Sequence, residues 1–285
     1  MHYLLLAIFF SSCIIVTFRL FSKLKIDNLQ AITANYLIAA LFCFFIWEEE
    51  IVFQELYHSP WFPWSIINGI LFILVFFIFA RSAQKAGVAV TAVASKMSVI
   101  IPVAIGFFIY GDHISFLKIA GILIAFPAFY LIFKKPDKPI EPDKRYIFLP
   151  LILFLGTGSN DSIMKHAQKY HIENEFLLFL GVIFTFSLII GSVFLIRKLL
   201  YTRQRLELRN LLAGFLLGFF NFSSTYFFLK GLTVFESSVF FPVFNVSIVS
   251  MGALIGLLIF KEKLWWKNWL GIVLAILTIL FIAFA

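Results

Sequence analysis

Lys96 is the residue of this sequence whose chemistry most needs an explanation. It lies in TAVASKMSVIIPV (residues 91–103), an apolar run that holds no other charged residue. A charge near the centre of a bilayer costs about 3 kcal/mol or more, so such a lysine normally faces water, an anion or a partner. We expect Lys96 to be a fixed cation that attracts a carboxylate or a phosphate. The alternative is that its long stem carries the ammonium to the membrane surface.

Three further polar residues interrupt apolar runs at a similar depth. They are Asp161 in GTGSNDSIMK, Asn221 in GFFNFSSTY and Asn245 in FFPVFNVSIVS. With 1.5 Å of rise per residue, Lys96 and Asn221 lie about 12 and 16 Å from the inner ends of their runs. By the same rise, Asn245 and Asp161 lie about 20 and 22 Å from theirs. Four runs thus bring polar groups to one central layer, which predicts a wet cavity halfway through the membrane.

Asp161 has two interpretations that the sequence leaves open. In the first, its carboxylate carries an exchangeable proton or opposes the charge of Lys96. In the second, it pairs with Lys165, four residues later, as in an ordinary salt bridge on one helix.

The other candidates are uncharged and their functional signal is weaker. Asn245 and Ser247 offer donors and acceptors to a zwitterion, but interhelical hydrogen bonds of about 0.6 kcal/mol each explain them equally. Asn35 and Asn221 fit packing better than binding. Pro102 and Pro242 are candidate hinges, because proline removes a helix hydrogen bond. The full set of candidate cavity residues is Lys96, Asp161, Asn245, Asn221, Asn35, Ser95, Ser98 and Ser247.

The elements that hold these residues follow from composition. The chain has 285 residues, of which 62% are hydrophobic and only 13% charged, including 39 Phe, and its mean hydropathy is +0.99. A soluble domain carries about a quarter charged residues, so bilayer hydrocarbon must solvate most of this surface. Because each run is continuously apolar over about 20 residues, the spans are helices rather than barrel strands. We predict ten of them: 2–20, 29–47, 63–81, 88–110, 116–134, 146–165, 175–197, 210–230, 238–260 and 265–284.

Several other classes of protein are disfavoured. The net charge is +8, but the charged residues lie in short gaps between the apolar runs and form no basic patch. We therefore expect no binding of nucleic acid. Cys13 and Cys43 lie inside apolar runs and indicate neither a disulfide nor a metal site. The five His residues are scattered near helix ends, so a membrane-embedded enzyme is only a distant alternative and no cofactor is expected.

An internal repeat organises the runs. YGDHISFLKIAGILIAF (110–126) aligns with FKEKLWWKNWLGIVLAI (260–276), 150 residues later. We therefore predict an all-α membrane protein made of two five-helix repeats, 1–135 and 146–285, joined by a linker at 136–145. An odd number of helices inverts the second repeat relative to the first, an architecture typical of transporters. Asp112 and Glu262 are expected to favour the N-termini of helices 116–134 and 265–284.

These features resemble the drug/metabolite transporter superfamily in its EamA-type branch. The residues that carry the resemblance are Asp112 and Gly121 in the first half, and Glu262 and Gly271 in the second. The resemblance implies a central cavity surrounded by the first four helices of each half, with helices 116–134 and 265–284 at the periphery. It also implies export or exchange of small metabolites, often amino acids. Bacterial members are usually drawn with cytoplasmic termini.

The charge pattern predicts the opposite orientation. Lys and Arg gather in the gaps after the odd-numbered runs, such as Arg19 to Lys25 and Arg197 to Arg209, while the first gap of the other face is acidic. Since Lys and Arg accumulate on the cytoplasmic side, both termini are expected outside.

Together these observations predict a secondary transporter in the plasma (inner) membrane. It would move a small polar or amphipathic metabolite, amino-acid-like, by alternating access. Since the chain has no glycine-rich loop for ATP, an ion or solute gradient would supply the energy. The expected partners are this substrate, a coupling proton and membrane lipid, and the protein would be a monomer or a homodimer. The alternative is a flippase of the same fold for lipid-linked sugars or lipid phosphates, whose head group could meet the basic linker.

Overall fold

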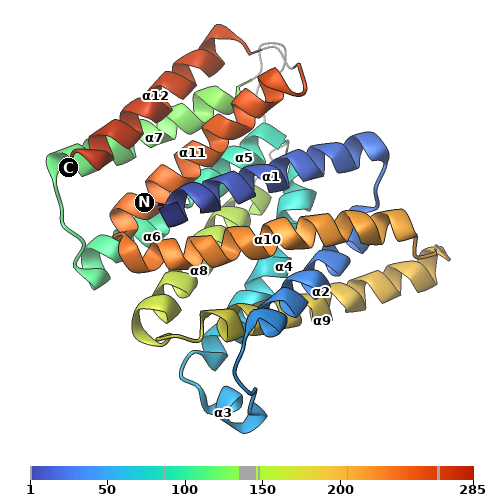
Figure 1. Ribbon diagram of the computed structural model, residues 1–285. Coiled ribbons are helices and arrows are strands. Elements are labelled where there is room, and N and C mark those ends of the chain that lie inside the picture. The colour runs from blue at the N-terminus through green and yellow to red at the C-terminus, as the bar shows by residue number, and fades with distance from the viewer. Residues whose placement is uncertain (1, 87, 135–145, 147, 204, 262–263) are drawn as a thin grey trace. The chain divides into compact units, whose positions relative to one another are not determined.

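The computed structural model describes residues 2–86, 88–134, 146, 148–203, 205–261 and 264–285, and every regular element within them is a helix (Figure 1). The spans of the first half are α1 (His2–Leu24), α2 (Asn28–Ile46), α4 (Phe62–Lys85), α5 (Val88–Met97) with α6 (Ile100–Ile105) and the π-helical turn η1 (Gly106–Tyr110), and α7 (Phe116–Phe133). Those of the second half are α8 (Phe148–Tyr170), α9 (Phe176–Thr202), α10 (Leu208–Val234), α11 (Ser237–Leu258) and α12 (Trp266–Ala283). A short helix, α3 (Phe53–His58), lies between α2 and α4. Glu262 and the linker 136–145 fall outside the described residues.

Nine spans in the described part of the chain are long and apolar enough to cross a membrane. α8 is not among them, because it contains the polar run GTGSND at residues 156–161. The all-helical membrane class is therefore established, and the tenth span and the inverted repeat remain predictions.

The span predicted over 88–110 is present, since Val90–Tyr110 is long and apolar enough to cross a membrane, but it is not one regular α-helix. α5 ends at Met97, and α6 begins only at Ile100. Pro102 has no N–H to donate to the carbonyl of Ser98, and the N–H of Ile101 donates to that oxygen instead, at 3.0 Å. The chain thus leaves the α-helical pattern two residues after Lys96, where a proline removes the bond that would continue it.

The chain forms two compact units. Unit 1 comprises Met1–Ile73 and His166–Thr233, and unit 2 comprises Leu74–Lys165 and Val234–Ala285. Each unit therefore combines helices from the first and the second half of the sequence.

Unit 1 is built on the contact between α2 and α9. A Cβ on Gly181 of α9 would lie 2.8 Å from the ring of Phe44, and one on Gly191 would lie 3.4 Å from Thr33 Oγ1. Since the later residue of α9 meets the earlier residue of α2, the two helices run antiparallel. The small residues let them approach closely, as is common where membrane helices pack.

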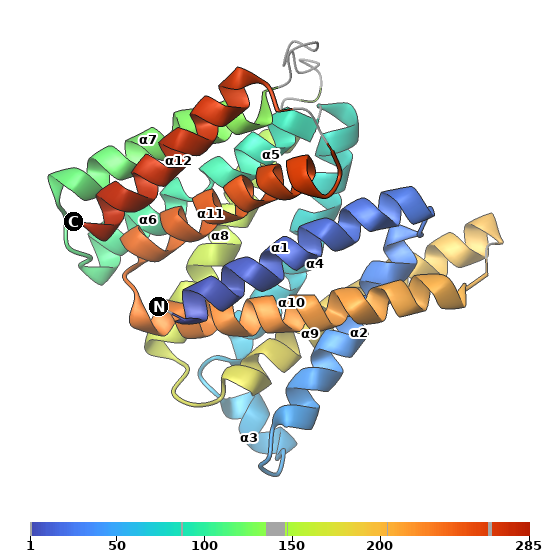
Figure 2. The ribbon, with the colours of Figure 1, turned by 45° about the horizontal axis from the view of Figure 1, so that its top comes forward.

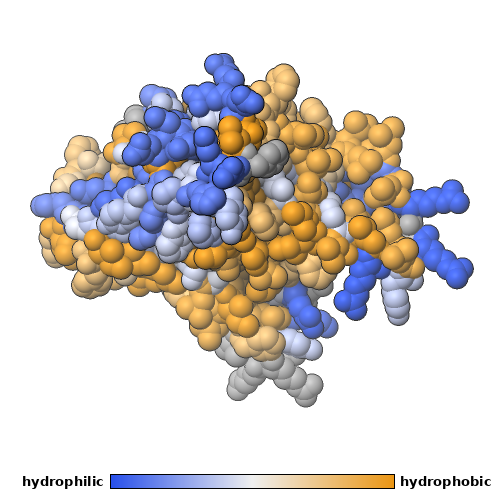
Figure 3. All heavy atoms as spheres, turned by 90° about the horizontal axis from the view of Figure 1, so that it is seen from below, coloured by the Kyte–Doolittle hydropathy of each residue, from blue (hydrophilic) through white to orange (hydrophobic). Residues whose placement is uncertain are grey.

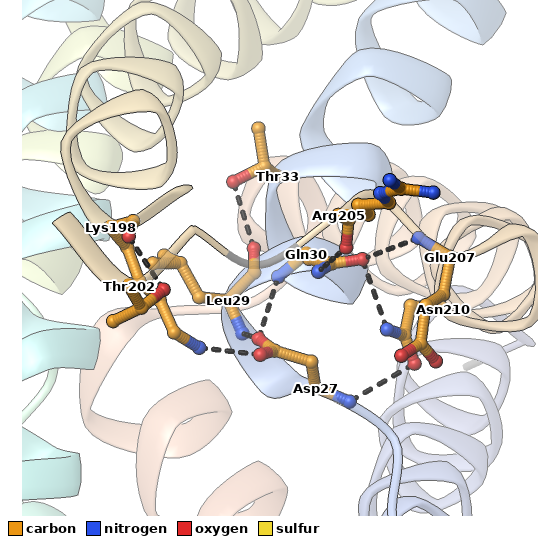
Figure 4. Close-up of polar contacts among 9 residues, drawn as sticks. All are labelled: Asp27, Leu29, Gln30, Thr33, Lys198, Thr202, Arg205, Glu207 and Asn210. Atoms are coloured by element: carbon orange, nitrogen blue, oxygen red, sulfur yellow. Dashed lines mark hydrogen bonds and ion pairs between the residues drawn. The ribbon is translucent and has the colours of Figure 1, made fainter. Parts of the chain in front are cut away.

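Polar side chains form a hydrogen-bonded cluster at one end of unit 1 (Figure 4). Asp27 caps α2 by accepting from the N–H of Leu29 and Gln30, and it also accepts from Lys198 Nζ at 2.5 Å. Gln30 Oε1 accepts from Asn210 Nδ2 at 3.0 Å. These bonds tie the turn between α1 and α2 to the turn between α9 and α10.

In unit 2, α7 and α12 lie side by side (Figures 1 and 2). Asn268, in the first turn of α12, donates its side-chain amide to carbonyls at the end of α7, including those of Leu131 and Lys134 at 2.9 and 2.8 Å. The last carbonyls of a helix lack the usual donor four residues on, and that of Leu131 accepts only a long bond of 3.4 Å from the N–H of Lys134, so the amide supplies hydrogen bonds that the end of α7 lacks.

The expected role of Asp112 also needs a correction. Asp112 Oδ2 accepts from the N–H of Ser238 at 2.7 Å, so it caps α11, while Ser115 caps α7. Asp112 follows Gly111, which ends η1 in the left-handed conformation with a φ of 71°. Residues with a Cβ rarely adopt such a φ, which explains why a glycine lies at this position. Nearby, the buried Lys118 forms an ion pair with Glu236, the residue that precedes α11.

The surface is that of a membrane protein. Large apolar side chains are exposed along several helices, among them Phe9, Leu123, Val193, Leu212 and Val273, each more than half exposed. In Figure 3, hydrophobic residues cover broad areas and hydrophilic residues gather in separate groups. Such broad apolar areas are unusual on soluble monomers and fit contact with lipid.

Candidate functional site

The candidate site lies in unit 2 and begins with a direct contact between two predicted residues. Lys96, in the last turn of α5, donates from Nζ to Asn245 Oδ1 of α11 at 3.0 Å. Asn245 is only 8% exposed, and its Nδ2 donates to the carbonyl of Phe241 at 3.0 Å. The amide of Asn245 is therefore oriented by its own helix so that its oxygen faces the ammonium.

A third helix contributes the opposite charge. Asp161 lies on α8, and the charges of Asp161 and Lys96 act on each other. The side chain of Asn160 donates a hydrogen bond to the Asp161 carboxylate. α5, α8 and α11 thus bring a cation, an anion and two amides together, and all of these residues belong to unit 2.

The backbone beside Lys96 is irregular. Ser98 Oγ donates to the carbonyl of Ser95 at 2.6 Å, and the N–H of Val99 reaches the carbonyl of Lys96 only at 3.4 Å. The carbonyl end of a helix carries partial negative charge, which favours an ammonium in the last turn of α5. The break before Pro102 therefore helps to hold the charge of Lys96.

Gly158 brings α8 close to this break. A Cβ at Gly158 would lie 2.4 Å from Ile101 Cδ1 and 2.9 Å from Ile101 Cβ. Only glycine lets α8 pack so tightly on the first turn of α6. Asp161, one turn later on α8, is placed near the site by this contact.

The other predicted residues lie around the site or away from it. Ser247 is half-buried on α11, two residues after Asn245, a spacing at which side chains do not share a helix face. Pro242 lies inside α11, which continues unbroken through it.

Asn35 and Asn221 belong to unit 1 and make local contacts. Asn35 Nδ2 reaches the carbonyl of Ile32 at 3.4 Å, and Asn221 Oδ1 accepts from Thr225 Oγ1 at 3.4 Å. On the neighbouring turn of α10, Ser224 shares a 2.6 Å hydrogen bond with Ser11 of α1. These contacts are of the kind expected for packing.

Sequence reasoning missed Asn160. This residue is 8% exposed, and its Oδ1 has no hydrogen-bond partner among the described residues. Two signals could have found it: its place beside Asp161, and its position in the least apolar of the long helices.

The arrangement offers donors and acceptors that face a common charge pair in apolar surroundings. Electrostatic attraction is stronger there than in water. Such a site suits a small molecule that carries a carboxylate, or both a carboxylate and an ammonium.

Comparison with known proteins agrees with the membrane architecture. Residues 144–284 match the model of the EamA-like transporter family. An uncharacterized protein of Haemophilus influenzae is 26% identical over 283 residues, covering 97% of this chain and 95% of the relative. A solved crystal structure shares the fold, with a TM-score of 0.78 and 12% identity over 98% of this chain and 94% of the other. The second half of the chain is therefore similar to the EamA-like transporter family, and the apolar helices of the described residues indicate a multi-pass membrane protein.

Proposed function

We propose that this protein is a secondary transporter that moves a small amino-acid-like metabolite across the plasma membrane by alternating access, for export or exchange. The observation that carries the proposal is the contact of Lys96 with Asn245, beside the charge of Asp161. Charged residues inside membrane spans are rare, and they mark substrate and ion pathways.

The chemistry of the pair fits a zwitterion. An ammonium has three N–H donors, and that of Lys96 can keep its bond to Asn245 while it donates to a substrate carboxylate. Asp161 then receives the substrate's ammonium, or it receives the coupling proton between transport steps. The binding of a dipolar substrate leaves the net charge of the site unchanged, so no unpaired charge enters the membrane.

The helix break supplies an element that can move. Lys96 lies in the last turn of α5, which ends at Met97, and residues 98 and 99 lie outside both α5 and α6. Transporters commonly bind their substrates at such discontinuous helices, near the interface of inverted repeats. In unit 2, the packing of α7 on α12 obeys the 150-residue offset of the predicted repeat, which supports that architecture.

Two measurements test the proposal. Thermal-shift screening of the purified protein uses amino acids, nucleotide sugars and lipid phosphates, since only a bound ligand stabilises the folded state. We expect amino acids to raise the unfolding temperature. Stabilisation by lipid phosphates or nucleotide sugars alone would favour a flippase or another substrate class.

The second measurement is solute flux in proteoliposomes. Lys96→Met keeps the stem and removes the charge, and it should reduce flux at least about tenfold, since hydrogen bonds to charged groups contribute about 1.5–3 kcal/mol. Lys96→Arg should retain part of the activity. Lys169→Met removes a charge from the exposed end of the same α8 that carries Asp161 and is the matched control. Equal flux in wild type and Lys96→Met would contradict the proposal.

A further inference from the structure

We propose that Asn160 and Asp161 form a subsite for an ammonium group that bears N–H donors, so that the substrate is a zwitterion with a protonated amine. This inference rests on the proposed transport function. It goes further because it assigns a role to Asn160 and defines which substrates the transporter selects.

The first support is the unequal environment of the two ends of the Asn160 amide. Its NH2 group donates to the Asp161 carboxylate. Its Oδ1 is buried, and within the described ranges it has no hydrogen-bond partner. A buried acceptor left unpaired costs about 1–3 kcal/mol, so such atoms in native proteins call for an explanation. A donor supplied by the substrate would remove this cost.

The second support is the order of charges in the site. Lys96 and Asn245 are hydrogen-bonded, so the cationic end lies between α5 and α11. Asp161 and Asn160 place the acceptors on α8. A zwitterion can match this order, with its carboxylate at Lys96 and its ammonium at Asp161. The ammonium has three N–H donors, enough for both oxygens of Asp161 and for Asn160 Oδ1.

The proposal separates substrates that differ only at nitrogen. An N,N,N-trimethyl derivative keeps the positive charge but has no N–H, and a desamino analogue has neither. A site built to receive N–H donors rejects ligands without them, because its acceptors then stay buried and unpaired. A site that reads charge alone would accept the trimethyl derivative.

The experiment begins with the purified full-length protein and the twenty common amino acids. The amino acid that stabilises the wild type most is then compared with its N,N,N-trimethyl and desamino analogues, by thermal-shift titration and by competition for flux. We expect the amino acid to bind at least about tenfold more tightly than either analogue. Asn160→Leu and Asn160→Ala should weaken binding of the amino acid about tenfold and leave binding of the trimethyl derivative unchanged.

Ser162→Ala is the matched control. It removes another buried polar group of α8, one already satisfied by the carbonyl of Gly158 at 2.6 Å. Its preference among the three ligands should equal that of the wild type.

The outcomes distinguish this inference from the proposed function. If no amino acid stabilises the wild type or crosses the membrane, the proposed function itself fails. If an amino acid is transported but its trimethyl derivative binds equally well, only the ammonium subsite is overturned, and this comparison needs no variant to fold. Stabilisation by Na⁺ that abolishes the preference would assign the same acceptors to a cation and would also overturn it.

Discussion

Gly121 of α7 and Gly271 of α12 contact each other's helices in the same way, with partners that are related by the same 150-residue offset. A Cβ on Gly121 would lie 2.8 Å from Ile282 Cγ1 and 3.2 Å from the carbonyl oxygen of Thr278. A Cβ on Gly271 would lie 2.8 Å from Ile132 Cγ1 and 3.0 Å from the carbonyl oxygen of Ala128. This reciprocity is what a two-fold axis between antiparallel repeats would produce.

The two glycines should nevertheless differ in their tolerance of substitution. A Cβ at Gly271 would also lie 2.8 Å from the backbone nitrogen of Ile132, which cannot yield, whereas Gly121 meets first the side chain of Ile282. We expect Gly271→Ala to lower the free energy of unfolding by about 1–3 kcal/mol, the usual cost of overpacking, and Gly121→Ala by less. Thermal unfolding in detergent measures both. Gly156→Ala, whose Cβ would meet only Val75 Cγ2 at 3.0 Å, is the control, and an equal loss at all three positions would refute the argument.

Hydropathy predicted most of the fold, because the need to bury backbone bonds in lipid allows few alternatives. The predicted run 116–134 is α7 (Phe116–Phe133), and 265–284 is α12 (Trp266–Ala283). Hydropathy alone did not predict the break before Pro102, although the proline itself had marked this position as a candidate hinge. The run 88–110 is apolar throughout, and hydropathy does not detect a missing hydrogen bond.

The contacts within the site were also beyond the sequence. Depth along each run predicted that Lys96 and Asn245 share a layer, but helices that are apolar all round do not show which face meets a neighbour. The contacts of Lys96 with Asn245 and of Asn160 with Asp161 depend on how each helix is rotated about its own axis. Asp112 illustrates the same limit, since it lies near the start of α7 in sequence yet caps α11.

Pro102→Ala tests the helix break. The new N–H could donate to the carbonyl of Ser98, which accepts from Ile101 in the wild type. We expect α5 and α6 to become more continuous, with an equal or higher unfolding temperature and a reduced flux, because the element beside Lys96 becomes stiffer.

Pro242→Ala is the comparison, because α11 already continues through Pro242. It should change flux less than Pro102→Ala. A Pro102→Ala protein that transports as fast as the wild type would show that the break is not required for turnover.

The ion pair between Asp27 and Lys198 should make unit 1 sensitive to acid. Burial raises the pKa of Asp27, but the hydrogen bond from Lys198 and those from the N–H of Gln30 and Leu29 outweigh it and hold the pKa below its ordinary value. A depressed pKa contributes stability above the unfolded value of about 3.9, and this stability is lost as pH falls through the folded pKa.

Asp27→Asn should therefore unfold more easily than the wild type at neutral pH, by about 1 kcal/mol. The difference should shrink as pH falls below about 4. Unfolding curves at pH 6 and pH 3 measure it. Glu207→Gln, at an exposed ion pair with Arg209, serves as the control and should have little effect. A constant difference between Asp27→Asn and wild type across this range would exclude the linkage.

Reporters at the two termini test orientation and the number of spans together. Hydrogen bonds of Asp27 with Lys198 and of Gln30 with Asn210 join the turn between α1 and α2 to the turn between α9 and α10. The basic residues of both turns therefore lie on one side of the membrane, and the excess of Lys and Arg predicts that this side is cytoplasmic. The N-terminus, at the other end of α1, is then outside.

If α8 crosses as the tenth span, a reporter fused after Ala285 is also outside, and one that requires the cytoplasm stays inactive. Two cytoplasmic termini would reverse the charge argument, and termini on opposite sides would show that α8, with Asp161, does not cross.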